Sequence, residues 1–396
     1  MANDNKTPAI RFKGYTDDWE QRKLGECVTF LDTMRKPLKE SEREKGIYPY
    51  YGASGIVDYV SDYIFDEELV LLSEDGANIT DRNYPVCFLA SGKYWVNNHA
   101  HVLKVNAENE NNFICNSLER MDFTQYNSGM AMPKLNKDVC HNIPLFCPIF
   151  EEQKQIGDFF RNLDTLITLH QHKLEKLQKI KKSMLQKMFP QNGANKPEIR
   201  FKGFTDAWEQ RKLGEVADIV GGGTPSTSND DYWDGDIDWY APAEIADQIY
   251  VASSERKITQ QGYDNSSAKM LPVGTVLFTS RAGIGKTAIL RKEGCTNQGF
   301  QSIVPHINEL DSYFIFSRSE EMKRYGETVG AGSTFVEVSG KQMANMELMM
   351  PTTMEEQVTI GSFFSNLDSL ITLHQRKCEK YKNIKSGLIR KLFPTI

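Results

Sequence analysis

The chain has 396 residues with 53 acidic and 47 basic side chains, which gives a formal net charge of −6. This length predicts two or three globular domains. The sequence has no apolar run near the roughly 20 residues of a membrane span, and its first residues lack the apolar stretch of a signal peptide. Seven scattered cysteines without a Cys-x-x-Cys pair favour reduced thiols in a cytoplasmic protein over disulfides or zinc.

Two segments of the chain occur twice. Residues 10–26 return as residues 199–215, and only two of these 17 positions differ. Residues 151–190 return as residues 355–394, with 24 of 40 positions identical. The repeats follow each other in the same order in both halves, so the chain contains one frame twice.

The segments between the repeats, about 27–150 and 216–350, are hard to align. Near-identical frames around dissimilar inserts predict one scaffold that carries two different heads. We therefore divide the chain into a first head (residues 1–150), a first spacer (151–190), a second head (191–350) and a second spacer (351–396). The net charges of these four segments are −6, +3, −6 and +3. Heads that bind DNA would therefore have to use local basic patches.

Both heads are predicted to be mixed, strand-rich domains. Apolar runs favour strands at residues 68–73, 85–90 and 94–96 in the first head, and at 274–279 and 287–290 in the second. Short helices are expected near 113–121 and 312–325. Loops at 94–101 and 221–240 combine Asn, Ser, Gly and aromatic residues, which suits contacts to base edges and backbone. The predicted fold class is α+β, with two strand-rich domains separated by two long helices.

Each spacer predicts one long helix with an apolar stripe. Residues 159–189 contain neither Gly nor Pro and would form a helix about 45 Å long. Stripe residues recur at spacings of three and four or their sums, as in a coiled coil. The expected stripes comprise Leu163, Leu166, His170, Leu174, Leu177, Ile180, Met184 and Met188, and Leu367, Leu370, His374, Cys378, Tyr381, Ile384, Leu388 and Leu392. Antiparallel pairing of the two helices would bury both stripes; alternatively, each helix packs on its own domain.

Several segments match motifs of catalytic proteins only in part. Residues 282–287 resemble a P-loop, but Ser280 stands where the motif requires Gly. We interpret this segment as a hairpin turn, with Arg281 and Lys286 as candidates for phosphate contacts. His99 and His101 lack a third metal ligand at a recognisable spacing. The sequence contains no recognisable catalytic residues, metal site or cofactor loop, so the residues alone predict a binding protein with two heads.

Six short motifs occur in a characteristic order: Tyr51-Gly52-Ala53-Ser54-Gly55, Asn97-Asn98-His99-Ala100-His101, Glu151-Glu152-Gln153-Lys154-Gln155-Ile156, Asn162-Leu163-Asp164, Gly222-Gly223-Thr224-Pro225-Ser226 and Asn297-Gln298-Gly299-Phe300. The third and fourth motifs occur again from Glu355 and Asn366. Together they resemble the specificity subunit of type I restriction-modification systems, over nearly the whole chain.

The resemblance implies a division of labour within a larger complex. The two heads would be target-recognition domains, each reading one half of a bipartite, asymmetric double-stranded DNA target. The helices would set the spacing of the heads and dock two methyltransferase subunits, which use S-adenosylmethionine to methylate adenine at N6. Two restriction subunits would add ATP-dependent translocation and cleavage with Mg²⁺. By this resemblance the chain is non-catalytic, holds no cofactor itself, contacts no membrane, and lies in the cytoplasm of a bacterium or archaeon.

The residues that contact DNA are expected among polar and basic loop positions. The candidates are Lys93, Asn97, Asn98, Asn127, Ser128 and Lys134 in the first head, and Thr224, Ser226, Arg281, Lys286, Gln298, Ser333 and Thr334 in the second. Two other functions remain possible. A stand-alone nuclease is disfavoured by the missing catalytic motifs, and a coiled-coil scaffold that does not bind DNA would agree with the acidic heads.

Overall fold

The computed structural model describes residues 6–245, 248–281, 283–331 and 337–394. The chain divides into two compact units. The first unit contains Met1–His172 together with Gln375–Ile396, and the second contains Lys173–His374. Each unit therefore holds one head and half of each spacer, so the units divide the chain differently from the four sequence segments.

The repeated frame forms the base of each head. In the first unit, β1 (Glu20–Lys23) pairs antiparallel with β10 (Pro144–Cys147), and in the second β11 (Glu209–Lys212) pairs with β20 (Glu347–Met350) in the same way. One short helix follows each first strand: α1 (Leu24–Cys27) and α6 (Leu213–Val216). The amide of Leu24 donates to the carbonyl of Ile143 at 2.8 Å, and the amide of Leu213 donates to the carbonyl of Met346 at 2.8 Å. These contacts bring the two ends of each insert together.

The first insert folds as two small sheets with helices. One sheet has the order β2-β9-β6-β7, and the other β4-β3-β8-β5. Their strands are β2 (Val28–Phe30), β3 (Lys45–Gly52), β4 (Gly55–Val60), β5 (Phe65–Asp66), β6 (Leu69–Ser73), β7 (Cys87–Ala90), β8 (Lys93–Val96) and β9 (Ala100–Val105). The helices are α2 (Asn78–Asp81), α3 (Asn111–Glu119) and α4 (Lys137–His141). Strand β6 is buried along its whole length because it lies between two neighbours, which explains its continuous apolar run.

The second insert has a similar pair of sheets, but with five and three strands where the first insert has four and four. Its sheets have the orders β12-β19-β16-β17-β14 and β15-β13-β18. Their strands are β12 (Ala217–Gly221), β13 (Trp233–Tyr240), β14 (Tyr250–Val251), β15 (Arg256–Ile258), β16 (Val276–Phe278), β17 (Thr287–Leu290), β18 (Cys295–Thr296) and β19 (Gln301–Pro305). The helices are α7 (Gln260–Asp264), α8 (Ser312–Phe316), α9 (Ser319–Gly330) and α10 (Gly340–Ala344). The α+β prediction is therefore confirmed, but the single helix expected at 312–325 is two helices.

The spacers form the long helices α5 (Phe150–Lys187) and α11 (Met354–Ile389). Within the first unit, Lys385 Nζ lies 2.7 Å from a carboxylate oxygen of Asp164, and the ring of Tyr381 stacks on His170 at 5.7 Å. Within the second unit, Lys181 Nζ lies 2.6 Å from Asp368. This second ion pair joins the positions that correspond to Lys385 and Asp164 in the repeat. In each unit the two helical segments therefore run antiparallel, side by side.

The positions of Leu166 and Leu370 require a correction. Their exposed fractions are 36% and 45%, so neither leucine belongs to the buried stripe. Ile167 and Ile371, each 9% exposed, take these places because the next residue along the helix faces the partner segment. The other expected stripe residues are buried or half-buried: Leu163, His170, Leu174, Leu177, Ile180, Met184, Met188, Leu367, His374, Cys378, Tyr381, Ile384, Leu388 and Leu392.

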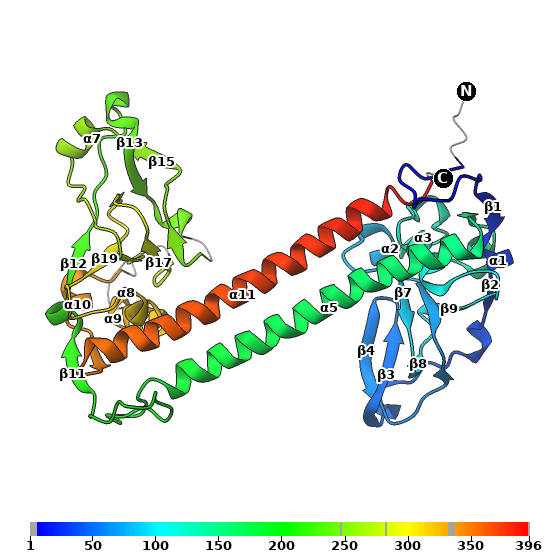
Figure 1. Cartoon of the computed structure of the whole chain (residues 1–396), viewed down its shortest axis with the longest axis horizontal. Helices are drawn as coiled ribbons and strands as arrows, with labels where there is room; N and C mark the ends of the chain where they lie inside the picture. Colours follow the sequence, from blue (N-terminus) through cyan, green and yellow to red (C-terminus); the bar gives the residue numbers. More distant parts are fainter. Residues whose placement is uncertain (1–5, 246–247, 282, 332–336, 395–396) are drawn as a thin grey trace. The chain divides into compact units, whose positions relative to one another are not determined.

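A phenylalanine shortly after the end of each long helix completes the core of a head. Phe393 is 2% exposed and packs against Trp19, Phe113 and Phe160. Figure 1 shows this C-terminal segment, in red, beside the N-terminal residues, in blue. A backbone hydrogen bond from Ile10 to the carbonyl of Lys391 joins the two segments at 3.0 Å. The first unit therefore depends on both ends of the described chain.

The second unit has the equivalent aromatic core. Phe189 packs against Trp208, Phe314 and Phe364, and the amide of Ile199 donates to the carbonyl of Lys187 at 2.9 Å. The sequence also allowed each long helix to pack on its own domain, and this is true of the start of each helix. Phe160 and Phe364 lie there and are fully buried in the cores of the first and second heads. None of the helices in the described part of the chain is long and apolar enough to cross a membrane.

The substitution Phe393→Ala should destabilise the first unit by about 3–5 kcal/mol, because it removes a buried aromatic ring from a packed core. Hydrogen exchange measured by mass spectrometry should show faster exchange in Trp19 and α3 and little change in the second unit. Leu166→Ala is the control, because that side chain is exposed. Equal acceleration in both units would contradict this account of the core.

Candidate nucleic-acid interface

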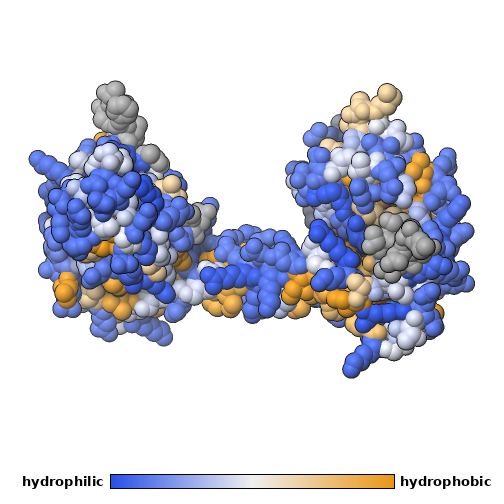
Figure 2. All heavy atoms as spheres, turned by 90° about the horizontal axis from the view of Figure 1, so that it is seen from above, coloured by the Kyte–Doolittle hydropathy of each residue, from blue (hydrophilic) through white to orange (hydrophobic). Residues whose placement is uncertain are grey.

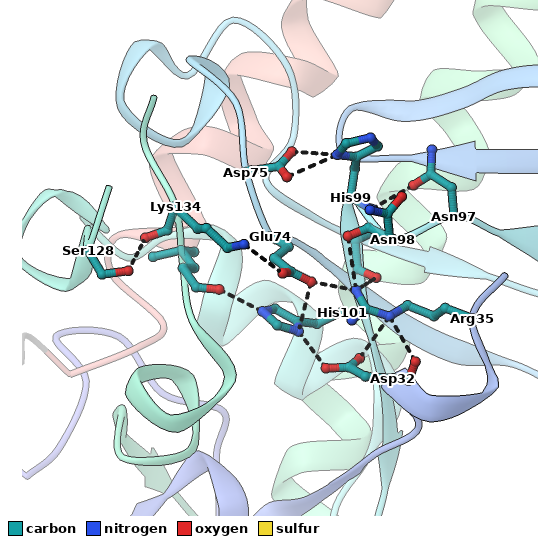
Figure 3. A network of polar contacts seen from close by, with 12 residues as sticks. Asp32, Arg35, Glu74, Asp75, Asn97, Asn98, His99, His101, Ser128 and Lys134 are labelled. Carbon is teal, nitrogen blue, oxygen red and sulfur yellow. Dashed lines mark hydrogen bonds and ion pairs between the residues drawn. The ribbon is translucent and has the colours of Figure 1, made fainter. Parts of the chain in front are cut away.

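A cluster of charged side chains lies beside the turn between β8 and β9 of the first head (Figure 3). We define this charged cluster as Asp32, Arg35, Glu74, His101 and Lys134. Arg35 Nη1 donates to Glu74 at 2.6 Å, Lys134 Nζ lies 3.4 Å from the same carboxylate, and His101 Nδ1 lies 2.7 Å from Asp32. Two carboxylates thus contact three basic side chains that come from distant parts of the sequence.

His101 is protonated on both ring nitrogens. Its side chain is 2% exposed; Nδ1 faces Asp32, and Nε2 lies 2.7 Å from the carbonyl oxygen of Leu135. Since a carbonyl and a carboxylate both accept hydrogen bonds, each ring nitrogen must donate. Burial is the largest single effect and lowers the pKa of His101, but the hydrogen bonds to Asp32 and Cys140 and the charges of these two groups together raise the pKa to about 10. Burial raises the pKa of Asp32, whereas His101 holds it below its usual value.

Arg35 fixes the backbone of the turn after β8. Its Nη1 donates to the carbonyl oxygens of Ala100 at 2.8 Å and Asn98 at 3.4 Å. Its Nε donates to the carbonyl of Asp32 at 3.2 Å. The turn is therefore held by a guanidinium group that is itself held by carboxylates, which limits its freedom to move.

The loop before α4 reaches the same cluster. Asn127 Oδ1 accepts from the amides of Gly129 at 2.9 Å and Lys134 at 2.8 Å, and Ser128 Oγ donates to the carbonyl of Lys134 at 3.0 Å. The amide of Leu135 donates to the carbonyl of Glu74 at 2.7 Å. These bonds fix the loop beside β6.

The structure therefore divides the first-head candidates into groups. Asn98 and Ser128 are exposed and Lys134 is half-buried, and all three lie at the charged cluster. Asn97 is only 8% exposed, and its Oδ1 accepts from the amide of His99 at 2.8 Å, so its side chain shapes the turn. Asn127 likewise holds its own loop. Lys93 lies elsewhere, with its Nζ 4.5 Å from the centre of the Tyr63 ring.

In the second head, the turn after β18 gathers several candidates. Thr224 Oγ1 donates to Gln298 Oε1. A Cβ atom at Gly222 would lie 2.1 Å from the carbonyl oxygen of Asn297, so only glycine allows the chain to pass so close to this turn. Ser226 lies further along the same loop, where its hydroxyl contacts Ser228 at 2.9 Å.

The segment that resembles a P-loop is a hairpin between β16 and β17. The amide of Thr279 donates to the carbonyl of Lys286, and the amide of Lys286 donates to Thr279 Oγ1, both at 3.0 Å. Lys286 is exposed, whereas Arg281 is half-buried and pairs with Glu337 through a backbone bridge. The hairpin prediction is confirmed. Ser333 and Thr334 lie outside the described residues.

Sequence reasoning missed Asp32, Arg35 and Glu74, because no local motif connects them. It considered His99 and His101 as metal ligands or, in preference, as residues of a strand or loop, and His101 does lie in strand β9. In the structure the two imidazoles contact different carboxylates, since both oxygens of Asp75 lie 2.9 Å from His99 Nδ1. Strand β9 is buried on both faces from Ala100 to Leu103, so alternation along the strand gives no signal that would single out His101.

The stability of the first head should depend on pH through His101. Because its folded-state pKa lies above the ordinary value of 6.5, the ion pair stabilises fully below about pH 6.5, and this contribution is lost as the pH rises towards 10. His101→Gln should cost about 3–5 kcal/mol at pH 7, because a buried carboxylate loses its partner. The variant should also show a weaker loss of stability between pH 7 and 10.

Hydrogen exchange of peptides from the first head, measured at several pH values, tests this expectation. His306→Gln is the matched control, because His306 is one-third exposed in the second head and pairs with Asp218 at 3.2 Å. Identical pH profiles for wild type and His101→Gln would show that His101 is not an essential cation.

Comparison with known proteins adds independent information. The family model described as the type I restriction modification DNA specificity domain matches residues 16–179 and again 205–383. A type I restriction enzyme specificity subunit from Methanocaldococcus jannaschii, MjaIX, is 34% identical over 189 residues, which are 47% of this chain and 44% of that protein. The EcoR124I/EcoR124II specificity subunit of Escherichia coli is 28% identical over 44% of this chain and 47% of its own length. The matched part thus spans slightly less than half of these relatives.

Other matches cover nearly the whole chain. The M. jannaschii MjaVIII specificity subunit is 21% identical over 95% of this chain and 92% of its own length. The crystal structure of a type I restriction-modification S subunit from M. genitalium superposes with a TM-score of 0.72 at 12% identity, covering 98% of this chain and 100% of that one. That structure supports the fold. Because the family model matches both halves and most of the sequence, the chain belongs to the type I restriction modification DNA specificity family.

Proposed function

We propose that this chain is the DNA-specificity subunit of a type I restriction-modification complex, in which each head reads one half of an asymmetric bipartite target. The observation that supports this most strongly is that two heads with similar but not identical sheets are built on one repeated frame, with different side chains at the corresponding turns. A scaffold that reads two unlike half-sites needs this combination of similar backbone and unequal surface.

The exposed polar groups at these turns suit contacts with DNA. Asn98, Ser128 and Gln298 offer donors and acceptors for base edges. Lys93, Lys134, Arg281 and Lys286 would contact phosphates, which contribute most of the affinity and little of the specificity. Such local contacts are needed because both heads are acidic as a whole. Ser333 and Thr334 stay candidates on the sequence alone.

The outer faces of the long helices would dock the methyltransferase subunits. Leu166 and Leu169 are 36% and 45% exposed, and Leu370 and Leu373, at the same positions in the second copy, are 45% and 44% exposed. Figure 2 shows hydrophobic patches on the helical segments, whereas the visible faces of the heads are mostly hydrophilic. Equal apolar pairs on two copies suit two copies of one partner.

The chemistry would belong to the partners. The methyltransferase subunits would bind S-adenosylmethionine and methylate adenine at N6, and two restriction subunits would use ATP and Mg²⁺ for translocation and cleavage. This chain would hold no cofactor, select the sequence, and act in the cytoplasm of a bacterium or archaeon. The target adenine must leave the duplex during methylation, so the heads must leave it accessible.

Sequencing of modified bases in DNA from cells that co-express the chain with its methyltransferase partner tests the proposed function. We expect N6-methyladenine in a motif of two unlike half-sites separated by unread bases. A palindromic or continuous motif would contradict two different reading heads. Cleavage of DNA by the purified chain with Mg²⁺ would favour the nuclease alternative, and absence of any motif-dependent binding by the complex would favour a scaffold.

Leu169→Glu or Leu373→Glu should weaken binding of the methyltransferase subunit at the altered helix, because a carboxylate would face an apolar contact. We expect the double variant to lose both partner copies in native mass spectrometry, and each single variant to lose one. Ile307→Glu is the control, because Ile307 is 89% exposed on a loop of the second head. Unchanged stoichiometry in the double variant would exclude these leucines from the docking surface.

A further inference from the structure

The two heads share a turn that the sequences do not reveal as equivalent. In the first head, Tyr51 and Val96 are partners in the parallel pair β3–β8, and the amide of Asn97 donates to the carbonyl of Tyr51 at 3.0 Å. The side-chain oxygen of Asn97 then accepts from the amide of His99 at 2.8 Å. We call residues 97–100 the first amide turn.

The second head builds the same turn with the same bonds. Tyr240 and Thr296 are partners in the parallel pair β13–β18, and the amide of Asn297 donates to the carbonyl of Tyr240 at 3.0 Å. The side-chain oxygen of Asn297 accepts from the amide of Gly299 at 2.8 Å. Residues 297–300 are the second amide turn, and each turn leads into an interior strand of its sheet, β9 or β19.

An arginine lies against each turn, although the two arginines come from different strands. Arg35, after β2, donates to carbonyl oxygens of the first turn. Arg281, after β16, lies against the second turn, where a Cβ atom at Gly299 would be 3.6 Å from its Nε. The same backbone turn is therefore contacted by an arginine in both heads, although the two arginines lie in unrelated segments of the sequence.

The tip of each turn carries a primary amide. Asn98 and Gln298 directly follow the structural asparagine, and both are exposed. A carboxamide has both a donor and an acceptor, and it can bond to N6 and N7 of adenine at the same time. The next position differs completely between the heads, since it holds His99 in one and Gly299 in the other.

Corresponding positions of the two heads should carry different side chains where the heads read different bases. They should carry side chains of the same chemical type where the heads read the same feature. Under the proposed function, the feature common to two unlike half-sites is the adenine that the partner methylates. The tip amides have the required chemistry, and they are alike in two inserts whose sequences otherwise differ.

We propose that Asn98 and Gln298 contact the A·T pair that contains the methylated adenine in their respective half-sites, while that pair is intact and before the adenine leaves the duplex. The bases that differ between the half-sites are read by other residues of each head. This proposal rests on the proposed function, and it assigns one shared contact to two positions that sequence comparison does not align.

The test uses the complete methyltransferase complex and duplexes that carry the target motif with one half-site already methylated. Such a duplex reports the rate at the other half-site alone. We expect Asn98→Ala and the isosteric Asn98→Asp to slow methylation of the first head's half-site by a factor of about 10 to 100, since neither keeps the paired donor and acceptor. The rate at the second half-site should stay within about threefold, as expected for contacts that belong to separate heads.

The reciprocal variants should act on the other half-site. Gln298→Ala should slow only the half-site of the second head, whereas Asn98→Gln and Gln298→Asn keep the amide group and should slow methylation less than the alanine variants, with an unchanged motif. Asn83→Ala, at an exposed asparagine of the first head, is the matched control. Hydrogen exchange of each variant verifies that its heads remain folded.

Three results would overturn the proposal. A normal rate for both Asn98→Ala and Asn98→Asp would show that the tip amide makes no important contact. A changed base in the motif of Asn98→Gln would show that the tip reads a variable position. Equal slowing of both half-sites would show a general effect on the complex. Failure of the proposed function is distinguishable from these results, because the wild-type complex would then methylate no bipartite motif.

Discussion

Each head depends on a buried phenylalanine that lies shortly after a long helix. Phe393 completes the aromatic core of the first head, and Phe189 completes that of the second, with a tryptophan of the repeated frame in contact with each ring. The first of these contacts joins segments from opposite ends of the described chain. The end of α11 packs in the core of the first head and the end of α5 packs in the core of the second, so each head is complete only when the helix that begins at the other head reaches it.

On this frame, the inserts can diverge in sequence and keep a similar pair of sheets. Backbone pairing determines the strand order, so each strand needs only a suitable apolar face. The turns between strands are free to carry different side chains, and there the first head has a charged cluster around a doubly protonated His101. Under the proposed function, this separation of a repeated framework from differing turns would let one fold read two different half-sites.

Some of this structure could be predicted from sequence. The long helices, the buried strand β6 and the hairpin around Lys286 follow from periodicity and turn residues. The sequence repeat also predicts that the two halves of the chain share one structural framework. Leu166 and Leu370 were placed wrongly, because a stripe written with spacings of three and four leaves the choice between adjacent residues open until the partner segment is known.

The candidate sites were harder to predict, because their contacts join distant residues. Asp32 and His101 are 69 positions apart and are brought together by strand pairing, which leaves no local pattern. Asn97 and Asn297 are equivalent because their backbone amides bond to Tyr51 and Tyr240, respectively. The sequence alone does not reveal these backbone hydrogen bonds. The residue types in the sequence identify the polar residues of both turns as candidates. They do not distinguish side chains that shape a turn from side chains that are available to a ligand.

Two recognition heads built on one repeated frame should be able to replace one another. A chain in which a second copy of residues 24–143 replaces residues 213–346 tests it most directly, since both cuts lie at equivalent backbone hydrogen bonds. Sequencing of modified adenines in cells that express this chain with the methyltransferase partner should give a symmetric bipartite motif that repeats the first head's half-site in inverted orientation. An unchanged asymmetric motif, or a correctly folded complex that methylates no bipartite motif, would contradict the account.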